Sequence, residues 1–289
     1  MLADFWHLNG DGNQTVTQAQ LVDLMAANQL IENVIYQPGP FAPARPQSIV
    51  GGRVFRNVSF RSAHFQGIEF RLSRFEDCLF MGAIFEHCEF HECTFVGCNP
   101  YKARFINTYI DPKVFDRTLD PEQHANIGVF LFQQLRFNAF ATYQPDFAES
   151  ADWLFRKWQR YELNYKFLKK RITGPKYWSK WTLSHIYELV AGFGHSFTRF
   201  AITSTILFAI IVIVNHTLWQ NFSTGGSALK ASHHWYSAWY FTAVTLTTLG
   251  YGDITPKTVC GMMLAGAEAL TGFFWFALLA AMLVRRFFR

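Results

Sequence analysis

The stretch TLTTLGYGDITP, Thr245–Pro256, lies between two apolar runs near the C-terminus. The first run, Phe200–Leu218, has 19 residues with two strongly polar members near one end. The second run, Val259–Val284, has 26 residues and contains one charged side chain, Glu268. At a helical rise of about 1.5 Å per residue, each run is long enough to cross a hydrocarbon layer of about 30 Å. The quoted stretch is therefore predicted to lie between two membrane spans.

The residues that lead into this stretch, His234–Thr247, are apolar and aromatic but too short to cross a membrane and return. We expect them to form a half-length helix of about twelve residues that ends near Thr247. Irregular backbone at membrane depth is tolerated only where protein buries it or where it lines a watery pore. The backbone of residues 248–252 is predicted to line such a pore.

Two glycines separated by one residue explain how this backbone could bind a cation. Carbonyl groups that coordinate one ion must all point to one axis, whereas in an ordinary strand they alternate. Turning every second peptide requires left-handed dihedrals, which cost a residue with a side chain about 1–2 kcal/mol and cost glycine little. Gly250 and Gly252 therefore predict a one-sided row of carbonyl oxygens, and the Thr248 hydroxyl is the expected innermost ligand.

The sequence TTLGYGD resembles the potassium-channel signature, which is usually written T-V-G-Y-G-D. The whole unit, about Phe197–Arg289, is similar to the two-transmembrane prokaryotic potassium channels. Leu249 replaces the commoner Val or Ile. It is expected to point away from the axis with Tyr251, so that both pack against the short helix. Asp253 would concentrate cations at the outer mouth. Some bacterial members place a glutamate partner for this aspartate at the position of Val244.

The resemblance implies a potassium-selective homotetramer, because each chain supplies one quarter of a carbonyl ring. It implies no cofactor and no metal other than permeant K⁺ in the filter. Gly272, twenty residues after Gly252, corresponds to a frequent gating hinge, and close helix packing is the equal alternative. The same alignment predicts the residues of the cavity and inner gate, which are Phe273, Phe276, Ala280 and Val284.

Glu268 is the expected buried carboxylate of the second span. An ionisable residue inside a membrane is a functional hypothesis by default. It lies one turn before Gly272 and is expected to face the short helix rather than the open cavity. Two roles stay open: a structural hydrogen bond behind the filter, for example to Thr245, or a gating or pH role.

Phenylalanine recurs every five residues from Phe55 to Phe95, and again at Phe105 and Phe115. A period of five fits neither a helix nor a strand, but fits a chain that turns a corner every five residues. The residue two places before a position of the series is usually small or apolar. These residues are Val58, Ala63, Ile68, Ser73, Cys78, Ala83, Cys88, Cys93, Cys98 and Ala103. Both sets should point inward, in coils stacked at about 4.8 Å. The pattern resembles the pentapeptide-repeat family, a right-handed quadrilateral β-helix, over about Gly51–Phe115.

We therefore expect a membrane protein with four parts. Residues 1–50 form an N-terminal capping segment, with a capping box at Thr17 and Gln20. Residues 51–118 form the β-helix, residues 119–196 a helical cytosolic linker with an interfacial helix, and residues 197–289 the two-span pore domain. The interfacial helix is expected in the aromatic, lysine-flanked segment around Trp178, where an ordinary core helix is the alternative.

Basic residues predict the orientation of the chain in the membrane. Nine lysines and arginines lie between Arg156 and Lys180, and the C-terminal end carries Arg285, Arg286 and Arg289. The loop between the spans has only Lys230 and Lys257. Both termini are therefore predicted to be cytoplasmic, in a multi-pass protein of the cell (inner) membrane. A net charge of +5 gives no argument for a nucleic-acid partner.

Several other functions compete with a potassium channel. A nonselective cation channel of the same architecture is the first, and a pentapeptide-repeat binding protein tethered to the membrane is the second. A zinc site built from the clustered cysteines with His87 and His91 is a third, although the five-residue phase turns these side chains to different faces. No catalytic motif points to an enzyme. The cytosolic part is expected to assist assembly, with gating by an unknown ligand or partner as a further hypothesis.

Overall fold

The computed structural model describes residues 5–37, 40–41, 48–116, 118–224 and 235–287. The chain divides into two compact units, residues 1–184 and 185–289. Lys230 and Arg289, which entered the orientation argument, lie outside the described residues, as does most of the proline-rich segment after Tyr36.

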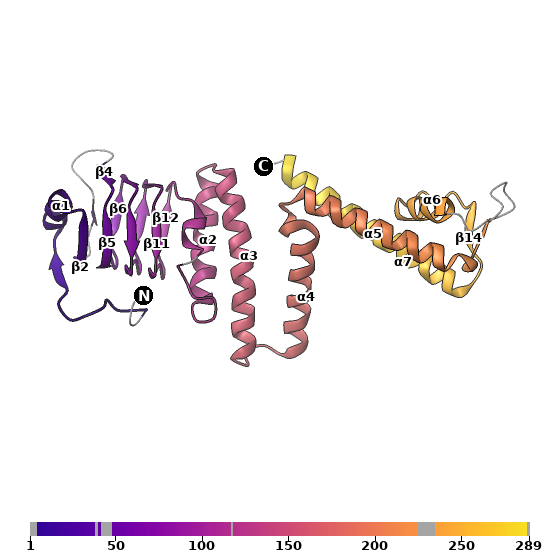
Figure 1. Cartoon of the computed structure of the whole chain (residues 1–289), viewed down its shortest axis with the longest axis horizontal. Coiled ribbons are helices and arrows are strands. Elements are labelled where there is room, and N and C mark those ends of the chain that lie inside the picture. The colour runs from indigo at the N-terminus through magenta and orange to yellow at the C-terminus, as the bar shows by residue number, and fades with distance from the viewer. Residues whose placement is uncertain (1–4, 38–39, 42–47, 117, 225–234, 288–289) are drawn as a thin grey trace. The chain divides into compact units, whose positions relative to one another are not determined.

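The N-terminal unit is built on three parallel sheets that form the walls of a coil (Figure 1). The first wall has the order β1 (Gln14–Val16), β2 (Leu30–Tyr36), β5 (Val54–Ser59), β8 (Arg74–Glu76) and β11 (Thr94–Val96). The second has the order β4 (Ser48–Gly51), β7 (Ile68–Arg71) and β10 (Glu89–His91). The third has the order β3 (Pro40–Phe41), β6 (His64–Gln66), β9 (Ile84–Glu86) and β12 (Arg104–Ile106).

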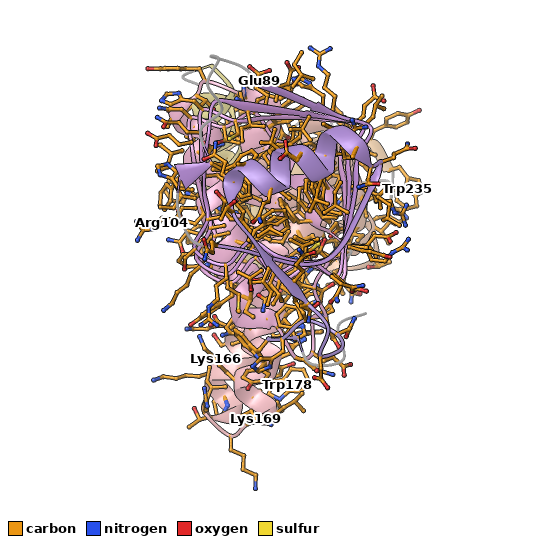
Figure 2. The ribbon with its side chains drawn as sticks, turned by 90° about the vertical axis from the view of Figure 1, so that its left-hand side faces the viewer. Glu89, Arg104, Lys166, Lys169, Trp178 and Trp235 are labelled. Carbon is orange, nitrogen blue, oxygen red and sulfur yellow. The ribbon has the colours of Figure 1, made fainter. Side chains whose placement is uncertain are left out.

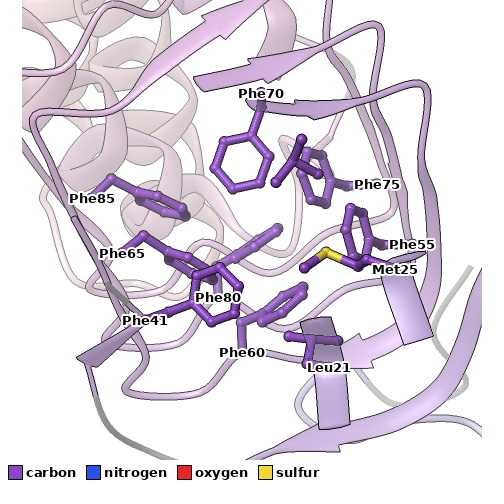
Figure 3. Close-up of a pocket in the computed structure, with 11 residues that line it drawn as sticks. Leu21, Met25, Phe41, Phe55, Phe60, Phe65, Phe70, Phe75, Phe80 and Phe85 are labelled. Carbon is purple, nitrogen blue, oxygen red and sulfur yellow. The ribbon is translucent and has the colours of Figure 1, made fainter. Parts of the chain in front are cut away.

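The phenylalanine series fills the interior of this coil, as predicted (Figure 3). Every phenylalanine of the series from Phe55 to Phe115 is buried. The register pairs residues twenty apart, so that Phe75 lies between Phe55 and Phe95. Their rings stack at centroid distances of 5.1 and 4.9 Å. Aromatic burial of this size is the main source of stability for the repeat.

The second inward set is also buried, and its polar members bond to the backbone of the preceding coil. Cys78 donates its thiol to the Phe55 carbonyl at 3.3 Å, and Cys88 donates to Phe65 at 3.4 Å. Thr108 makes the same bond to Phe85 at 2.8 Å. The thiol and hydroxyl groups of this second inward set therefore donate hydrogen bonds to backbone carbonyl groups of the preceding coil.

The corners of the coil have a backbone signature that the sequence did not reveal. From position 55 to position 105 of the series, the second residue after each position has a positive φ between 49° and 69°. These residues are Asn57, Ser62, Gly67, Leu72, Asp77, Gly82, His87, Glu92, Gly97, Lys102 and Asn107. Three of these eleven residues are glycine, so most corners impose left-handed dihedrals on residues with side chains. Charged side chains such as Glu89 and Arg104 point outward from the coil (Figure 2).

The β-helix begins earlier than the predicted boundary at residue 51. Strand β2 pairs with β5 and places Ile31 beside Phe55, while β3 and β4 place Phe41 beside Phe65 and Val50 beside Phe70. The N-terminal segment thus supplies one more coil without the five-residue period. The predicted capping box is confirmed at the start of α1 (Gln18–Ala27), which contributes Leu21 and Met25 to the coil interior (Figure 3).

Helices complete the N-terminal unit. After a short 3₁₀ turn (Pro112–Phe115), α2 (Ala125–Ala141) and α3 (Pro145–Leu168) pack against each other. Gly128 of α2 lies so close to Trp158 that an added Cβ would be 2.0 Å from the ring. Asp152 is buried between Arg136 and Arg156, at 3.2 Å from each. Lys166 and Lys169 project at the far end of α3 (Figure 2).

Helix α4 (Gly174–Ala191) crosses the boundary between the two units. Its large apolar side chains Trp178, Leu183, Ile186 and Leu189 are all more than half exposed. The interfacial helix and its alternative, an ordinary core helix, both stay predictions.

The C-terminal unit contains three further helices, which are α5 (Phe197–Thr217), α6 (Trp235–Leu246) and α7 (Val259–Phe287). Two of them, residues 197–217 and 259–284, are long and apolar enough to span a membrane, as predicted. Trp275 of α7 donates to the Ser204 hydroxyl of α5 at 2.7 Å. A short antiparallel pair, β13 (Phe222–Thr224) and β14 (Ile254–Pro256), lies beside the predicted filter.

Candidate functional site

The half-length helix and the irregular backbone after it are present as predicted. Helix α6 has twelve residues and ends at Leu246. Three alternate residues then have left-handed dihedrals: Thr248 with φ 57°, Gly250 with φ 54° and Gly252 with φ 77°. Glycine accepts this conformation freely, but a β-branched residue such as threonine is strained in it. The alternation is the backbone geometry that a one-sided carbonyl row requires.

The side chains between these positions are largely uncovered in one chain. Leu249 and Tyr251 are 61% and 68% exposed. Their packing against a short helix in an assembly of several copies stays a prediction. The exposed faces of both side chains are free to contact another copy.

Asp253 lies near a side chain that the sequence argument could not name. The hydroxyl of Tyr240, on α6, is close to the Asp253 carboxylate. The backbone N–H of Ile254 donates to Asp253 Oδ1 at 3.1 Å. Val244, the position where a glutamate partner was considered, is buried. Tyr240 thus places a hydroxyl group of the short helix beside the residue that follows the irregular segment.

Gly272 touches the end of α6. A Cβ added at this glycine would lie 2.1 Å from the Leu246 carbonyl oxygen and 2.8 Å from its carbonyl carbon and Cα. Only glycine allows two backbones to approach this closely. The contact lies two residues before Thr248 in the chain. It supports the packing alternative for Gly272 and does not by itself test a hinge.

A cavity of about 540 Å³ lies next to the filter segment, between α5, α6 and α7. Its lining includes Thr247, Thr248, Phe273 and Phe276. Both phenylalanines line this cavity within one chain, and their place in a central pore cavity stays a prediction. Ala280 and Val284 are exposed on the same helix and do not line this cavity in the single chain. Their place at an inner gate stays a prediction.

Glu268 is 4% exposed, in accord with the expected buried carboxylate. It neighbours the side chain of Asn215 on α5, and Asn215 Nδ2 donates to Thr242 Oγ1 on α6 at 2.9 Å. Thr245, the partner considered from the sequence, makes no hydrogen bond to this carboxylate in the described chain. Asn215 carried a signal that could have been used, since it is a strongly polar residue within an apolar span.

The clustered cysteines do not form a zinc site in the described residues. Their thiols are buried and bond to backbone carbonyls, and burial raises the pKa of Cys88 to about 11. A different group, Glu69, Glu89 and His91, has ligand atoms within 4.8 Å of one another. Arg71 pairs with Glu69, and His91 Nε2 lies 2.9 Å from Glu89. The side chains of this group thus already contact one another and Arg71.

Two protein families match the chain. Residues 201–289 match the family described as "Ion channel", and residues 54–94 match the family described as "Pentapeptide repeats (9 copies)". The chain therefore carries an ion-channel domain and a pentapeptide-repeat domain. Neither family is an enzyme family. Together with the two helices that are long enough to cross a bilayer, the ion-channel domain places the protein in a membrane.

The curated relatives of the channel domain are potassium channels. "Potassium voltage-gated channel protein Shal" of Drosophila melanogaster is 42% identical over 53 residues, which are 18% of this chain and 9% of that protein. "A-type voltage-gated potassium channel KCND3" of Homo sapiens is 38% identical over 78 residues, 27% of this chain and 12% of that protein. "Hyperpolarization-activated voltage-gated potassium channel" of Methanocaldococcus jannaschii is 50% identical over 34 residues, 12% of this chain and 16% of that protein. The chain thus spans between 9% and 16% of the length of these relatives.

A solved structure is similar to part of the chain. It is a trypsin-treated variant of QnrB1, described as "a plasmid-mediated fluoroquinolone resistance protein". Its sequence is 20% identical, its TM-score is 0.18, and the match covers 27% of this chain and 44% of that chain. A likeness at this score adds nothing to the sheet topology described above.

Proposed function

We propose that the protein is a potassium-selective channel in which four copies surround one pore. The observation that carries the proposal is the alternation of left-handed dihedrals at Thr248, Gly250 and Gly252, after a half-length helix. Such a backbone can turn successive carbonyl oxygens to one side, where they replace the water around a dehydrated cation. The likeness to potassium channels supports K⁺ as the ion.

The proposed roles of the individual residues follow from this geometry. Residues 248–252 would supply the carbonyl ligands, and the Thr248 hydroxyl would add the innermost ligand. Asp253, close to the Tyr240 hydroxyl, would attract cations at the outer mouth. Leu249 and Tyr251, exposed in one chain, would be covered by the next copy. The C-terminal end of α6 would direct its dipole toward a cation in the cavity.

The test is electrical. The full chain is purified in detergent, its copy number is measured by native mass spectrometry, and it is reconstituted into planar bilayers. With K⁺ on one side and Na⁺ on the other, we expect a reversal potential that reports a much higher permeability to K⁺ than to Na⁺. We also expect Ba²⁺ to block the current. Equal permeability to Na⁺ would reject the selectivity and leave a nonselective cation channel. Replacing Gly250 or Gly252 with alanine should abolish the discrimination.

We further propose that the pentapeptide-repeat unit is cytosolic and assists assembly, with both termini on the cytoplasmic side of the cell membrane. Support comes from an exposed aromatic group at the C-terminal end of α2, which is Phe137, Phe140 and Tyr143. Exposed α4 side chains such as Trp178 suit contact with the lipid interface. Deleting residues 1–118 tests the role: an unchanged copy number and open probability would leave the unit without a part in assembly or gating.

A further inference from the structure

Three buried polar side chains meet behind the filter segment, one from each helix of the channel domain. Asn215 of α5 and Thr242 of α6 have no exposed surface, and Glu268 of α7 is almost fully buried. Asn215 Nδ2 donates to Thr242 Oγ1, and the Asn215 side chain neighbours the Glu268 carboxyl group. One chain is sufficient to enclose this group.

Three oxygen atoms of this group receive no hydrogen bond within the described chain. Asn215 Oδ1 and both carboxylate oxygens of Glu268 are buried and receive no hydrogen bond within the described chain. An ionised carboxylate can only accept hydrogen bonds, so it would leave all three oxygens without a partner. It would also bury a negative charge, which is costly unless the charge is paired. A protonated carboxyl group supplies one O–H, which can serve an acceptor such as Asn215 Oδ1 that otherwise receives no hydrogen bond.

No charged side chain offsets a negative charge at this place in the described chain, where Asn215 is the one group that interacts with Glu268. The other ionisable side chains described on the three helices are accounted for elsewhere. His216 of α5 stacks on Trp235 at 4.1 Å, and Tyr240 of α6 lies close to Asp253. The remaining ones, all of them exposed, are Arg199, Tyr236 and Cys260.

We propose that Glu268 keeps its proton at neutral pH and that its carboxyl O–H donates a hydrogen bond to Asn215 Oδ1. Thr242, Asn215 and Glu268 then form one continuous chain of hydrogen bonds that fixes the pore helix between the two spans. The inference rests on the proposed channel function, because α6 leads directly into the filter backbone. Glu268 is accordingly a positioning residue that acts through the pore helix, and its loss of the proton at alkaline pH breaks the chain.

Infrared difference spectroscopy of the full chain tests the protonation without any need for conduction. The spectrum of the wild type minus that of Glu268→Gln should contain the C=O stretch of a protonated carboxyl group at neutral pH. This band should shift in D₂O and convert to carboxylate bands at alkaline pH. A difference spectrum that contains only carboxylate bands at neutral pH would overturn the proposal.

Currents test the positioning role. Glu268→Gln retains size, neutrality and a donor, so we expect K⁺ currents near those of the wild type and no loss at alkaline pH. Glu268→Leu and Asn215→Leu each break the chain, and we expect about a tenfold loss of conducting channels. The double variant should lose no more than either single variant. The proposal is overturned if the wild type conducts K⁺ but Glu268→Gln behaves like Glu268→Leu, or still loses current at alkaline pH. A wild type that does not conduct K⁺ would reject the channel function, and the infrared result would still decide the protonation.

Discussion

Replacing Gly272 with alanine adds one methyl group where α7 touches the end of the pore helix. The new Cβ would lie 2.1 Å from the Leu246 carbonyl oxygen, whereas ordinary van der Waals contact begins near 3.4 Å. The two helices must therefore separate by about 1.3 Å at this point. The obstructing atoms belong to the backbone, so no side-chain rotation can relieve the contact.

The energetic cost follows from two opposing effects. Forcing an extra methyl group into a tight contact costs about 1–3 kcal/mol. Alanine in place of glycine stabilises a helix by about 1 kcal/mol, which offsets part of this cost. We expect a net destabilisation of up to about 2 kcal/mol, concentrated at Leu246. Thr248, two residues later, already has a positive φ of 57°, so the shift should reach the filter backbone.

Gly266 provides the matched control, because it lies on the same helix and an added Cβ there meets no atom within 4 Å in the chain. Reversal potentials in mixed K⁺ and Na⁺, and thermal melting of the assembly in K⁺, should be measured for Gly272→Ala and Gly266→Ala. We expect a lower K⁺ preference and a lower melting temperature only for Gly272→Ala. Equal behaviour of the two variants would refute the packing argument. Changed open probability with intact selectivity would point to a hinge instead.

Three further predictions test other parts of the structure. Burial lowers the pKa of His124 below 6.5, so as the pH falls the histidine of the unfolded chain binds a proton at a higher pH than that of the folded chain. The N-terminal unit should therefore lose stability as the pH falls below 6.5. Circular dichroism melts should show this loss, and His124→Gln should remove it. Cys88 is buried with a pKa of about 11, whereas Cys260 is exposed. Alkylation near pH 7.5, detected by mass spectrometry, should therefore label Cys260 and not Cys88. Rapid labelling of Cys88 would contradict its place in the core. Tyr240→Phe removes the hydroxyl that lies close to Asp253 and should speed the loss of current during sustained opening, whereas Tyr236→Phe, at an exposed position, should not.

The sequence predicted the interior of the β-helix but not its corners or its start. A repeated phenylalanine identifies an inward position because side-chain chemistry and position coincide there. The corner positions share only a backbone conformation, and residues as different as Leu72, His87 and Lys102 adopt it. Ile31 and Phe41 occupy interior positions of the first coil at an offset of 24 residues from Phe55 and Phe65. No period marks them.

In the channel domain, the length of an apolar run was sufficient to predict the spans and the pore helix. Contacts between helices were not predictable in this way, because a single sequence does not show which residues of different helices are in contact. The hydrogen bond of Asn215 to Thr242 and the approach of Tyr240 to Asp253 bring together residues that are 27 and 13 positions apart. Likewise, the sequence position of Gly272 is compatible with a hinge and with close packing. The structure adds the contact between Gly272 and Leu246, which supports close packing.

Exposed apolar side chains and exposed backbone in the channel domain are the physical argument for an assembly of several copies. The β-helix buries its phenylalanines within one chain, so it can fold on its own core. The channel domain leaves Leu249, Tyr251, Phe273 and Phe276 more than 60% exposed. Lipid could cover such side chains, but it cannot satisfy the exposed backbone of Gly250 and Gly252, since an unpaired peptide group in hydrocarbon costs several kcal/mol. That backbone needs water or ions on one side and protein on the other, and further copies of the same chain around an axis provide both.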